Sequence, residues 1–139
     1  ENFKMMAEEN DRQLKVDNKV QELIFTDKTL LKQVMTILFD NAIKYSEDGG
    51  LIQIQLDVRD RHLIFSIADD GLGISDADKK KIFDRFYRVD KARTRQKGGF
   101  GLGLSLAKQI LDILNGTITV KNNQPKGSIF EVRLPIKTK

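Results

Sequence analysis

The chain has 139 residues, of which 40% are apolar, a size and composition that suit one domain with a single packed core. Because it contains no cysteine, disulfides, thiolate metal sites and cysteine nucleophiles are excluded. No apolar run approaches the roughly 20 residues of a membrane-spanning helix, and residues 1–13 lack the apolar segment of a signal peptide. The net charge of +4 is unevenly distributed, because six basic residues fall within residues 85–97, and this favours a local polyanionic partner.

The chain opens in a charged stretch without an initiator Met, so we expect it to be a piece of a longer protein. Residues 1–12 are predicted to form the end of a preceding helix. Residues 13–17 and 22–25 are predicted to form two short strands. The patterns that follow contain no repeats or low-complexity segments, so residues 1–139 are expected to form a single domain.

A long amphipathic helix is predicted over residues 27–45, where apolar residues recur at steps of three and four. Thr26 or Asp27 is a natural N-cap for this helix. After a glycine-containing turn, residues 52–58 alternate apolar and polar side chains as a half-buried strand does. Residues 63–69 form a second predicted strand, which is expected to pair with the first across a short polar turn.

The second half of the chain is predicted to contain two helices and two strands. A short helix capped by Ser75 or Asp76 should reach about residue 85. A basic loop follows it, and loops of this length in compact domains are typically functional or disordered. Residues 102–114 are predicted to be helical, and residues 117–121 and 128–134 to be strands. Strands gathered against about three helices indicate a two-layer α/β sandwich with a mixed sheet.

Asn41 lies where the long helix should be apolar, because it follows Val34 by seven positions and Ile37 by four. One interpretation is an asparagine that caps a neighbouring loop, since buried polar groups find partners. The other is a neutral oxygen ligand for Mg²⁺, which prefers hard oxygen atoms and keeps several waters when phosphates supply the rest. Lys44 and Tyr45 offer a cation for phosphate and a ring near the same place.

Asp69 continues the apolar face of its predicted strand, where a carboxylate is costly unless a donor meets it. It is either a strand-end residue that caps the following turn or an acceptor for the amino group of a planar base. Gly71 and Gly73 remove side chains beside it, which would let a flat ligand approach the backbone.

A glycine run, GGFGLGL (residues 98–104), opens the second long helix. Backbone N–H groups at a helix start are exposed where the helix dipole is positive, so they can bind phosphate. The run is neither a dinucleotide-binding fingerprint nor a Walker P-loop, because no strand leads directly into it and no Gly-Lys-Ser/Thr follows. His62, the single histidine, is predicted to be a strand-end residue, and it makes no metal set without cysteine.

Taken in order, these motifs resemble the catalytic, ATP-binding domain of sensor histidine kinases, in the superfamily of gyrase, chaperone, histidine kinase and mismatch-repair ATPases. The resemblance covers nearly the whole chain, and four motifs in the family's order make it specific. QVMTILFDNAIKYS (residues 33–46) resembles the N box, IADDGLGI (67–74) the first glycine box, IFDRFYRVD (82–90) the F box, GGFGLGLSLAKQI (98–110) the second glycine box, and KGSIFEVRLP (126–135) the closing strand.

The resemblance implies a Bergerat-type nucleotide fold: a mixed, mainly antiparallel sheet against about three helices, with ATP under a mobile lid. It implies that Asn41 holds Mg²⁺ and that Lys44 and Arg88 face the phosphates during catalysis. It also implies that Asp69 accepts a hydrogen bond from the adenine amino group. The other residues that it places at the nucleotide are Tyr45, Gly71, Gly73, Ile74, Gly99, Gly101, Leu102, Gly103, Leu104 and Ser128.

Two positions depart from the family pattern. Ile37 stands where many of these kinases have a second asparagine, so one polar contact to nucleotide or metal is expected to be absent. Hydrolytic relatives have a glutamate there as the general base for water, so its absence favours phosphoryl transfer over ATP hydrolysis. Asp70 stands where asparagine is frequent and is expected to face solvent.

The resemblance implies that the domain binds Mg²⁺ and ATP and transfers the γ-phosphoryl group to a histidine on a separate dimerisation domain, the first step of two-component signal transduction. The expected partners are that phosphoacceptor domain and a response regulator, with no nucleic acid. Such acceptor histidines are followed by an acidic residue, whereas His62 is followed by Leu63, so no acceptor is expected in this chain.

This piece is expected to be monomeric and the full protein homodimeric. The full protein would be a bacterial membrane-bound sensor that places this domain in the cytoplasm, with membrane contact only through segments outside this chain. The alternatives left open are an anti-sigma-type serine kinase, a hydrolytic ATPase, and a nucleotide-sensing or RNA-binding module.

Overall fold

The computed structural model describes residues 2–21, 24–84 and 103–138. No helix in these ranges has the length and apolar character needed to span a bilayer. The described helices are α1 (Asn2–Glu9), α2 (Lys28–Tyr45), α3 (Asp76–Lys79) and α5 (Gly103–Ile113). The strands are β1 (Gln13–Asn18), β2 (Ile24–Phe25), β3 (Leu51–Arg59), β4 (His62–Asp69), β5 (Thr117–Asn122), β6 (Ser128–Pro135) and β7 (Lys137–Thr138).

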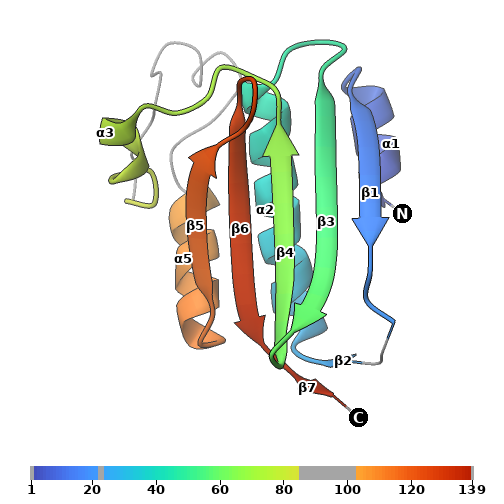
Figure 1. Ribbon diagram of the computed structural model, residues 1–139, viewed down its shortest axis with the longest axis vertical. Coiled ribbons are helices and arrows are strands. Elements are labelled where there is room, and N and C mark those ends of the chain that lie inside the picture. The colour runs from blue at the N-terminus through green and yellow to red at the C-terminus, as the bar shows by residue number, and fades with distance from the viewer. Residues whose placement is uncertain (1, 22–23, 85–102, 139) are drawn as a thin grey trace.

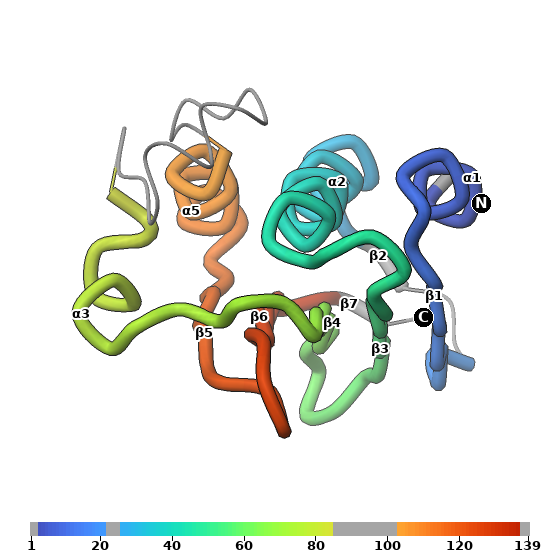
Figure 2. The backbone as a smooth tube through the Cα atoms, turned by 90° about the horizontal axis from the view of Figure 1, so that it is seen from above, coloured from blue at the N-terminus to red at the C-terminus, as the bar shows by residue number. Residues whose placement is uncertain are grey.

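The elements form two layers, a sheet and a row of helices (Figure 1). The main sheet has five strands in the order β1-β3-β4-β6-β5. β1 and β3 are parallel and the other neighbours are antiparallel, so the predicted mixed, mainly antiparallel sheet is confirmed. Figure 2 shows α1, α2 and α5 side by side on one face of this sheet. β2 and β7 form a separate antiparallel pair.

The core lies between the two layers because α2 and the central strands each bury one face. α2 starts at Asp27, whose side chain accepts a hydrogen bond from the N–H of Leu30 at 3.0 Å and so caps the helix. Across the sheet, Ile67 of β4 lies opposite Ile54 of β3 on one side and opposite Phe130 of β6 on the other. The fully buried side chains of the core include Val34, Leu38, Phe39, Ile52, Phe65, Leu111, Val132 and Leu134.

The N-terminal helix belongs to the helical layer. The ring of Phe3 in α1 stacks on the ring of Phe39 in α2, with 4.8 Å between their centroids. Ala7 is buried, at 1% exposure, and contributes to the same core. Residues 2–9 are thus helical, and the packing of α1 against α2 places the corner between α1 and β1 beside the C-terminal end of α2 (Figure 2).

The short helix is the element whose predicted length is wrong. It was expected to reach about residue 85, but α3 ends at Lys79. Of the two predicted caps, Ser75 is the one observed, and it accepts a hydrogen bond from the N–H of Asp78. Tight turns follow, in which the N–H of Lys81 donates to the carbonyl of Asp78, and they bring Ile82 into the core with 3% of its surface exposed. Burial of this apolar side chain outweighs continuation of a solvated helix.

Candidate functional site

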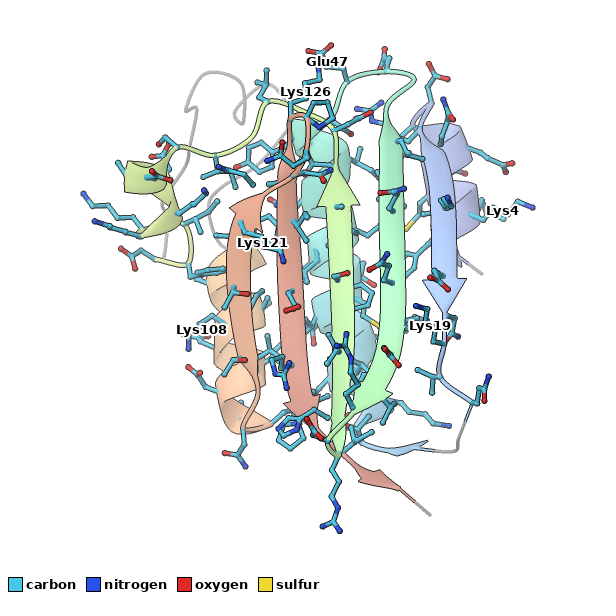
Figure 3. The ribbon with its side chains drawn as sticks, viewed as in Figure 1. Lys4, Lys19, Glu47, Lys108, Lys121 and Lys126 are labelled. Carbon is cyan, nitrogen blue, oxygen red and sulfur yellow. The ribbon has the colours of Figure 1, made fainter. Side chains whose placement is uncertain are left out.

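The candidate residues gather at one end of the sheet. There α2 leads into β3, β4 ends, and β5 turns into β6 (Figure 1). Glu47, which follows α2, and Lys126, in the turn between β5 and β6, project at this same end (Figure 3). Residues distant in the sequence therefore become neighbours here.

Asp69, the last residue of β4, is buried, with 2% of its surface exposed. Its Oδ1 atom accepts a hydrogen bond from the N–H of Gly71 at 2.9 Å, and its Oδ2 atom accepts one from the hydroxyl of Ser128 at 2.9 Å. Asp69 therefore caps the turn after β4. A carboxylate has about four acceptor positions, so capacity for a further donor remains.

The environment of Asp69 perturbs its ionisation. Burial raises the pKa of the Asp69 carboxyl above its ordinary value, because the charged form is poorly solvated. The hydrogen bonds from Gly71 and Ser128 act in the opposite direction, and the nearby charge of Asp70 adds to the increase. The net effect is a higher pKa, which is common for carboxyl groups at ligand-binding sites.

Gly71 is required by a close approach between two backbone segments. A Cβ atom at this position would lie 1.8 Å from the carbonyl oxygen of Tyr45, the last residue of α2. The adjacent N–H of Leu72 donates to that same oxygen at 3.4 Å. The sequence-based interpretation was space for a flat ligand, whereas the structure shows that this space is filled by α2. Gly73 has φ +79°, a left-handed conformation that favours glycine.

Substitution Gly71→Ala is therefore expected to lower the free energy of unfolding by about 3 kcal/mol or more, because the methyl group and the backbone of α2 cannot occupy the same space. Chemical denaturation of both proteins measures the difference. Gly49→Ala is the control for an added methyl group: Gly49, unlike Gly71, has a positive φ, +79°, but a Cβ there meets nothing within 4 Å. Its expected cost is only about 1 kcal/mol of backbone strain. Equal losses for the two variants would show that the contact with Tyr45 is not what requires Gly71.

Asn41 lies on α2, one turn before its end, and is half-buried. Its amide nitrogen Nδ2 is buried and has no hydrogen-bond partner among the described residues. A buried donor without a partner costs about 1 to 3 kcal/mol, so the loop-capping interpretation gains no support here. An acceptor from outside the described chain, such as a phosphate oxygen, would satisfy this nitrogen.

Lys44 and Tyr45 follow on the last turn of α2. The Lys44 ammonium lies 3.3 Å from a carboxylate oxygen of Asp40, and 28% of the lysine side chain is exposed. This exposed i,i+4 pair is weak, so an anionic ligand can compete for the lysine. Tyr45 is buried, at 8% exposure, and α2 itself connects Asn41 and Lys44 to the contact between Tyr45 and Gly71.

The donor set at this site fits a magnesium ion held mainly by its nucleotide. Asn41 offers one neutral amide oxygen as a ligand, while its Nδ2 atom remains a donor for a phosphate oxygen. The described residues contain no group of three or more histidine, cysteine, aspartate or glutamate side chains suited to a metal. Mg²⁺ commonly takes only one or two protein ligands and completes its shell with phosphates and water, so such a cluster is not needed.

The start of α5 is the remaining described part of the predicted site. Gly103 is its exposed first residue, and a Cβ there would lie 3.4 Å from Cγ2 of Ile37 in α2. Leu104 is half-buried against the core, and Ile74 is buried in it at 6% exposure. The other predicted contacts, together with the predicted lid, lie outside the described residues: Arg88, Gly99, Gly101 and Leu102.

Three residues near the site were not predicted. Asn123 donates from Nδ2 to the backbone carbonyl of Asp69 at 2.8 Å, and a Cβ on Gly127 would lie 1.9 Å from that oxygen. Arg12 is buried at 7% exposure against the end of α2. Gly127 had a usable signal, a glycine directly before the closing strand. The sequence gives no such signal for Arg12, because a charged residue in a charged stretch is normally exposed to solvent.

The predicted exposure of Asp70 is wrong. It was expected to face solvent, but it is half-buried, and its Oδ2 atom accepts a hydrogen bond from the N–H of Leu51 at 3.2 Å. The carboxylate thereby holds the first residue of β3 next to the segment that follows β4. His62 lies as predicted, at the start of β4, with its Nδ1–H donating to the carbonyl of Asp60 at 2.9 Å.

Curated relatives align with almost the whole chain. The chain is 62% identical over 137 residues to the sensor protein CiaH of Streptococcus pneumoniae serotype 4, which covers 99% of this chain and 31% of CiaH. It is 42% identical over 113 residues to the sensor histidine kinase WalK of Bacillus subtilis, covering 80% of this chain and 18% of WalK. The chain thus spans less than a third of the length of these relatives.

Solved structures and a family match agree with these relatives. The catalytic domain of the histidine kinase ThkA superposes with a TM-score of 0.83 at 26% identity, covering 96% of this chain and 85% of that one. The mycobacterial sensor histidine kinase MprB gives 0.80 at 25% identity, with 98% and 90% covered. Residues 26–138 match the family described as histidine kinase-, DNA gyrase B-, and HSP90-like ATPase. The chain therefore belongs to this ATPase family, and the proteins that it resembles include the sensor histidine kinases WalK and MprB.

Proposed function

We propose that this domain binds ATP with Mg²⁺ and transfers the γ-phosphoryl group to a histidine on a separate phosphoacceptor domain. The observation that carries the proposal is the buried carboxylate of Asp69, held by Gly71 and Ser128 at the end of the sheet next to α2. With acceptor capacity left, Asp69 accepts a hydrogen bond from the amino group of adenine. Membership of the ATPase family supports this assignment.

The phosphate end of the nucleotide lies along the last turns of α2 in this proposal. The buried Nδ2 atom of Asn41 gains a phosphate acceptor, and Lys44 exchanges its carboxylate partner for phosphate. Asn41 would hold Mg²⁺ through its amide oxygen, and the ion would supply neutralisation of the phosphate charge. The transfer breaks the bond between the γ-phosphorus and its bridging oxygen and forms a bond to an imidazole nitrogen. The protein contributes mainly by positioning these groups.

Phosphoryl transfer is favoured over ATP hydrolysis by the residue at position 37. A hydrolytic enzyme needs a general base that activates water. Ile37 is a half-buried hydrocarbon side chain that lies near Gly103, so it cannot remove a proton. Arg88, the second catalytic cation in the proposal, lies outside the described residues.

The partners follow from the relatives. We assign a response regulator as the downstream partner, because one ThkA structure, 25% identical to this chain with a TM-score of 0.78, is a complex with the response regulator TrrA. The proposal further includes a homodimeric, membrane-bound full-length sensor with this domain on the cytoplasmic side, since the curated relatives are sensor proteins.

Calorimetric titration tests the nucleotide assignment. The chain is expected to bind a non-hydrolysable ATP analogue, and to bind it more tightly with Mg²⁺ than without, because the metal screens the phosphate charges from each other and from Asp40. A structured RNA at the same ionic strength is expected to bind weakly or not at all. Absence of analogue binding, or preference for RNA, would refute the proposal.

The chain is expected to bind ATP without labelling itself. His62 stands at the opposite end of β4 from Asp69, seven residues and about 23 Å away, so it cannot receive phosphate from this site. Incubation with γ-labelled ATP should leave this chain unlabelled. Label should appear only when a separate domain with a phosphoacceptor histidine is added, and it should appear on that domain. Strong self-labelling that disappears in His62→Ala would contradict this expectation.

A further inference from the structure

The Arg12 guanidinium is fully engaged at the C-terminal end of α2. Its Nε atom donates to the hydroxyl of Ser46 at 2.7 Å, and its Nη2 atom donates to the carbonyls of Ile43 at 3.0 Å and Ser46 at 2.9 Å. Its Nη1 atom donates to the carbonyl of Asn10 at 2.6 Å and to a carboxylate oxygen of Asp48 at 3.0 Å. These five bonds match the five N–H donors of the guanidinium group.

This arrangement caps a helix with a buried cation. Only 3% of the Arg12 side chain is exposed, whereas 86% of the Asp48 side chain is exposed. The backbone carbonyls, rather than the ion pair with Asp48, are therefore the main partners that hold Arg12 in place. Carbonyl groups at a helix C-terminus have no partner within the helix, and a cation there also interacts favourably with the helix dipole. Arg12 therefore fixes the backbone of residues 43–46 relative to the corner between α1 and β1.

Two of these residues, Tyr45 and Ser46, are in contact with the nucleotide site on their other side. The carbonyl of Tyr45 lies against Gly71, so close that no side chain fits between them. The N–H of Gly71 in turn holds the carboxylate of Asp69. A continuous series of contacts thus runs from Arg12 through the last turn of α2 to Asp69.

We propose that Arg12 is a positioning residue for the nucleotide site, and this inference rests on the function proposed above. Arg12 does not touch the ligand. It fixes the last turn of α2, which carries Lys44 and Tyr45, against the segment that holds Asp69. The part of the site proposed to bind phosphate and the part proposed to bind the base are thereby held at a fixed distance and orientation.

Two substitutions of Arg12 test the proposal. Arg12→Met keeps the aliphatic length but removes all five donors, and Arg12→Lys keeps the charge with three donors on a single atom. The dissociation constant of a non-hydrolysable ATP analogue with Mg²⁺ is measured at a low temperature where melting curves show every variant to be folded. Arg12→Met is expected to weaken binding by on the order of tenfold, because small displacements of site residues are costly. The dissociation constant of Arg12→Lys should lie between those of Arg12→Met and the wild type.

Leu63→Ala provides the control for stability alone. Leu63 is a core residue, 2% exposed, at the end of β4 away from Asp69. This variant should have a lower melting temperature but an unchanged dissociation constant in the folded protein. If Arg12→Met also melts early yet binds like the wild type, Arg12 is a stabilising residue only and the proposal is wrong. Should Arg12→Met fail to fold, Arg12→Lys decides the question by the same comparison.

A ligand-free measurement separates this inference from the proposed function. The amide resonances of Gly71 and Leu72 report the contact with Tyr45 and the bond to Asp69. They are expected to shift in Arg12→Lys and not in Leu63→Ala. If the wild type binds no nucleotide, the proposed function fails, while shifted Gly71 resonances still support the positioning role. Unshifted resonances together with unchanged binding overturn the role of Arg12 alone.

Discussion

Substitution Asn41→Ala is expected to abolish Mg²⁺-dependent phosphotransfer while leaving the domain at least as stable as the wild type. The transfer rate should fall by about 100-fold or more, as when one preorganised polar group is removed from an active site. Stability should be retained because the substitution removes a buried amide nitrogen that lacks a partner in the described structure. Alanine is also the best helix former. Phosphotransfer to an added acceptor domain and thermal melting measure the two effects.

Gln33→Ala is the matched control, since Gln33 is an exposed residue of the same helix and lies away from the site. It should retain both transfer activity and magnesium dependence. A loss of stability in Asn41→Ala with unchanged transfer would instead identify Asn41 as an ordinary core residue whose partner lies elsewhere in the chain.

Substitution Asp69→Asn is expected to weaken ATP binding and to narrow the preference for ATP over GTP. The Asp69 carboxylate can accept from the amino group of adenine but would oppose the carbonyl oxygen that guanine has at that position. A buried acceptor left unpaired costs about 1 to 3 kcal/mol, so the wild type should prefer ATP by at least about tenfold. In the variant one carboxylate oxygen becomes an NH₂ group, which cannot accept from adenine.

Asp69→Asn is expected to change the free energy of unfolding only slightly, because both hydrogen bonds of this side chain can be kept. The asparagine oxygen can still accept from the N–H of Gly71, and its NH₂ group can donate to Ser128, because a hydroxyl both donates and accepts. Asp70→Asn serves as the control, since its carboxylate holds Leu51 instead. Dissociation constants for ATP and GTP with saturating Mg²⁺ provide the test. Equal wild-type affinities for the two nucleotides would leave Asp69 with its turn-capping role only.

The raised pKa of Asp69 adds a pH dependence with a defined sign. Burial makes the pKa of Asp69 higher in the folded protein than in the unfolded chain. The stabilising contribution of Asp69 to the free energy of unfolding is therefore complete below the unfolded pKa. That contribution is lost as the pH rises through the folded pKa. Melting temperatures of wild type and Asp69→Asn should therefore diverge in favour of the variant as pH rises through this range, and a constant difference would contradict the burial effect.

Periodic elements were predictable from the sequence because their signal is local. The bounds of α2 and of the strands β3, β4, β5 and β6 lie within one residue of those predicted, since one buried face imposes a repeat on each of them. The end of α3 was not predictable. It depends on the attraction of Ile82 to a core formed by residues elsewhere in the chain, which outweighs local helix propensity.

The site was predictable where a polar residue interrupts an apolar pattern. Asn41 and Asp69 stand out for this reason, and the structure places both at the predicted elements. The residues that hold the site together were not identified, because their partners are distant. Arg12 binds carbonyls 31 and 34 residues away, and no periodicity records such a contact. Asn123 likewise reaches Asp69 across 54 residues.

The hydrogen bond between Asp69 and Ser128 joins residues 59 positions apart, so this part of the site exists only after β4 and β6 have paired. A nucleotide that contacts both residues recognises the folded chain and ignores the unfolded one. By mass action, ligand at 100 times its dissociation constant then adds about 2.7 kcal/mol to the free energy of unfolding. The persistence of the folded domain would in this way depend on the supply of ATP as well as on its own packing.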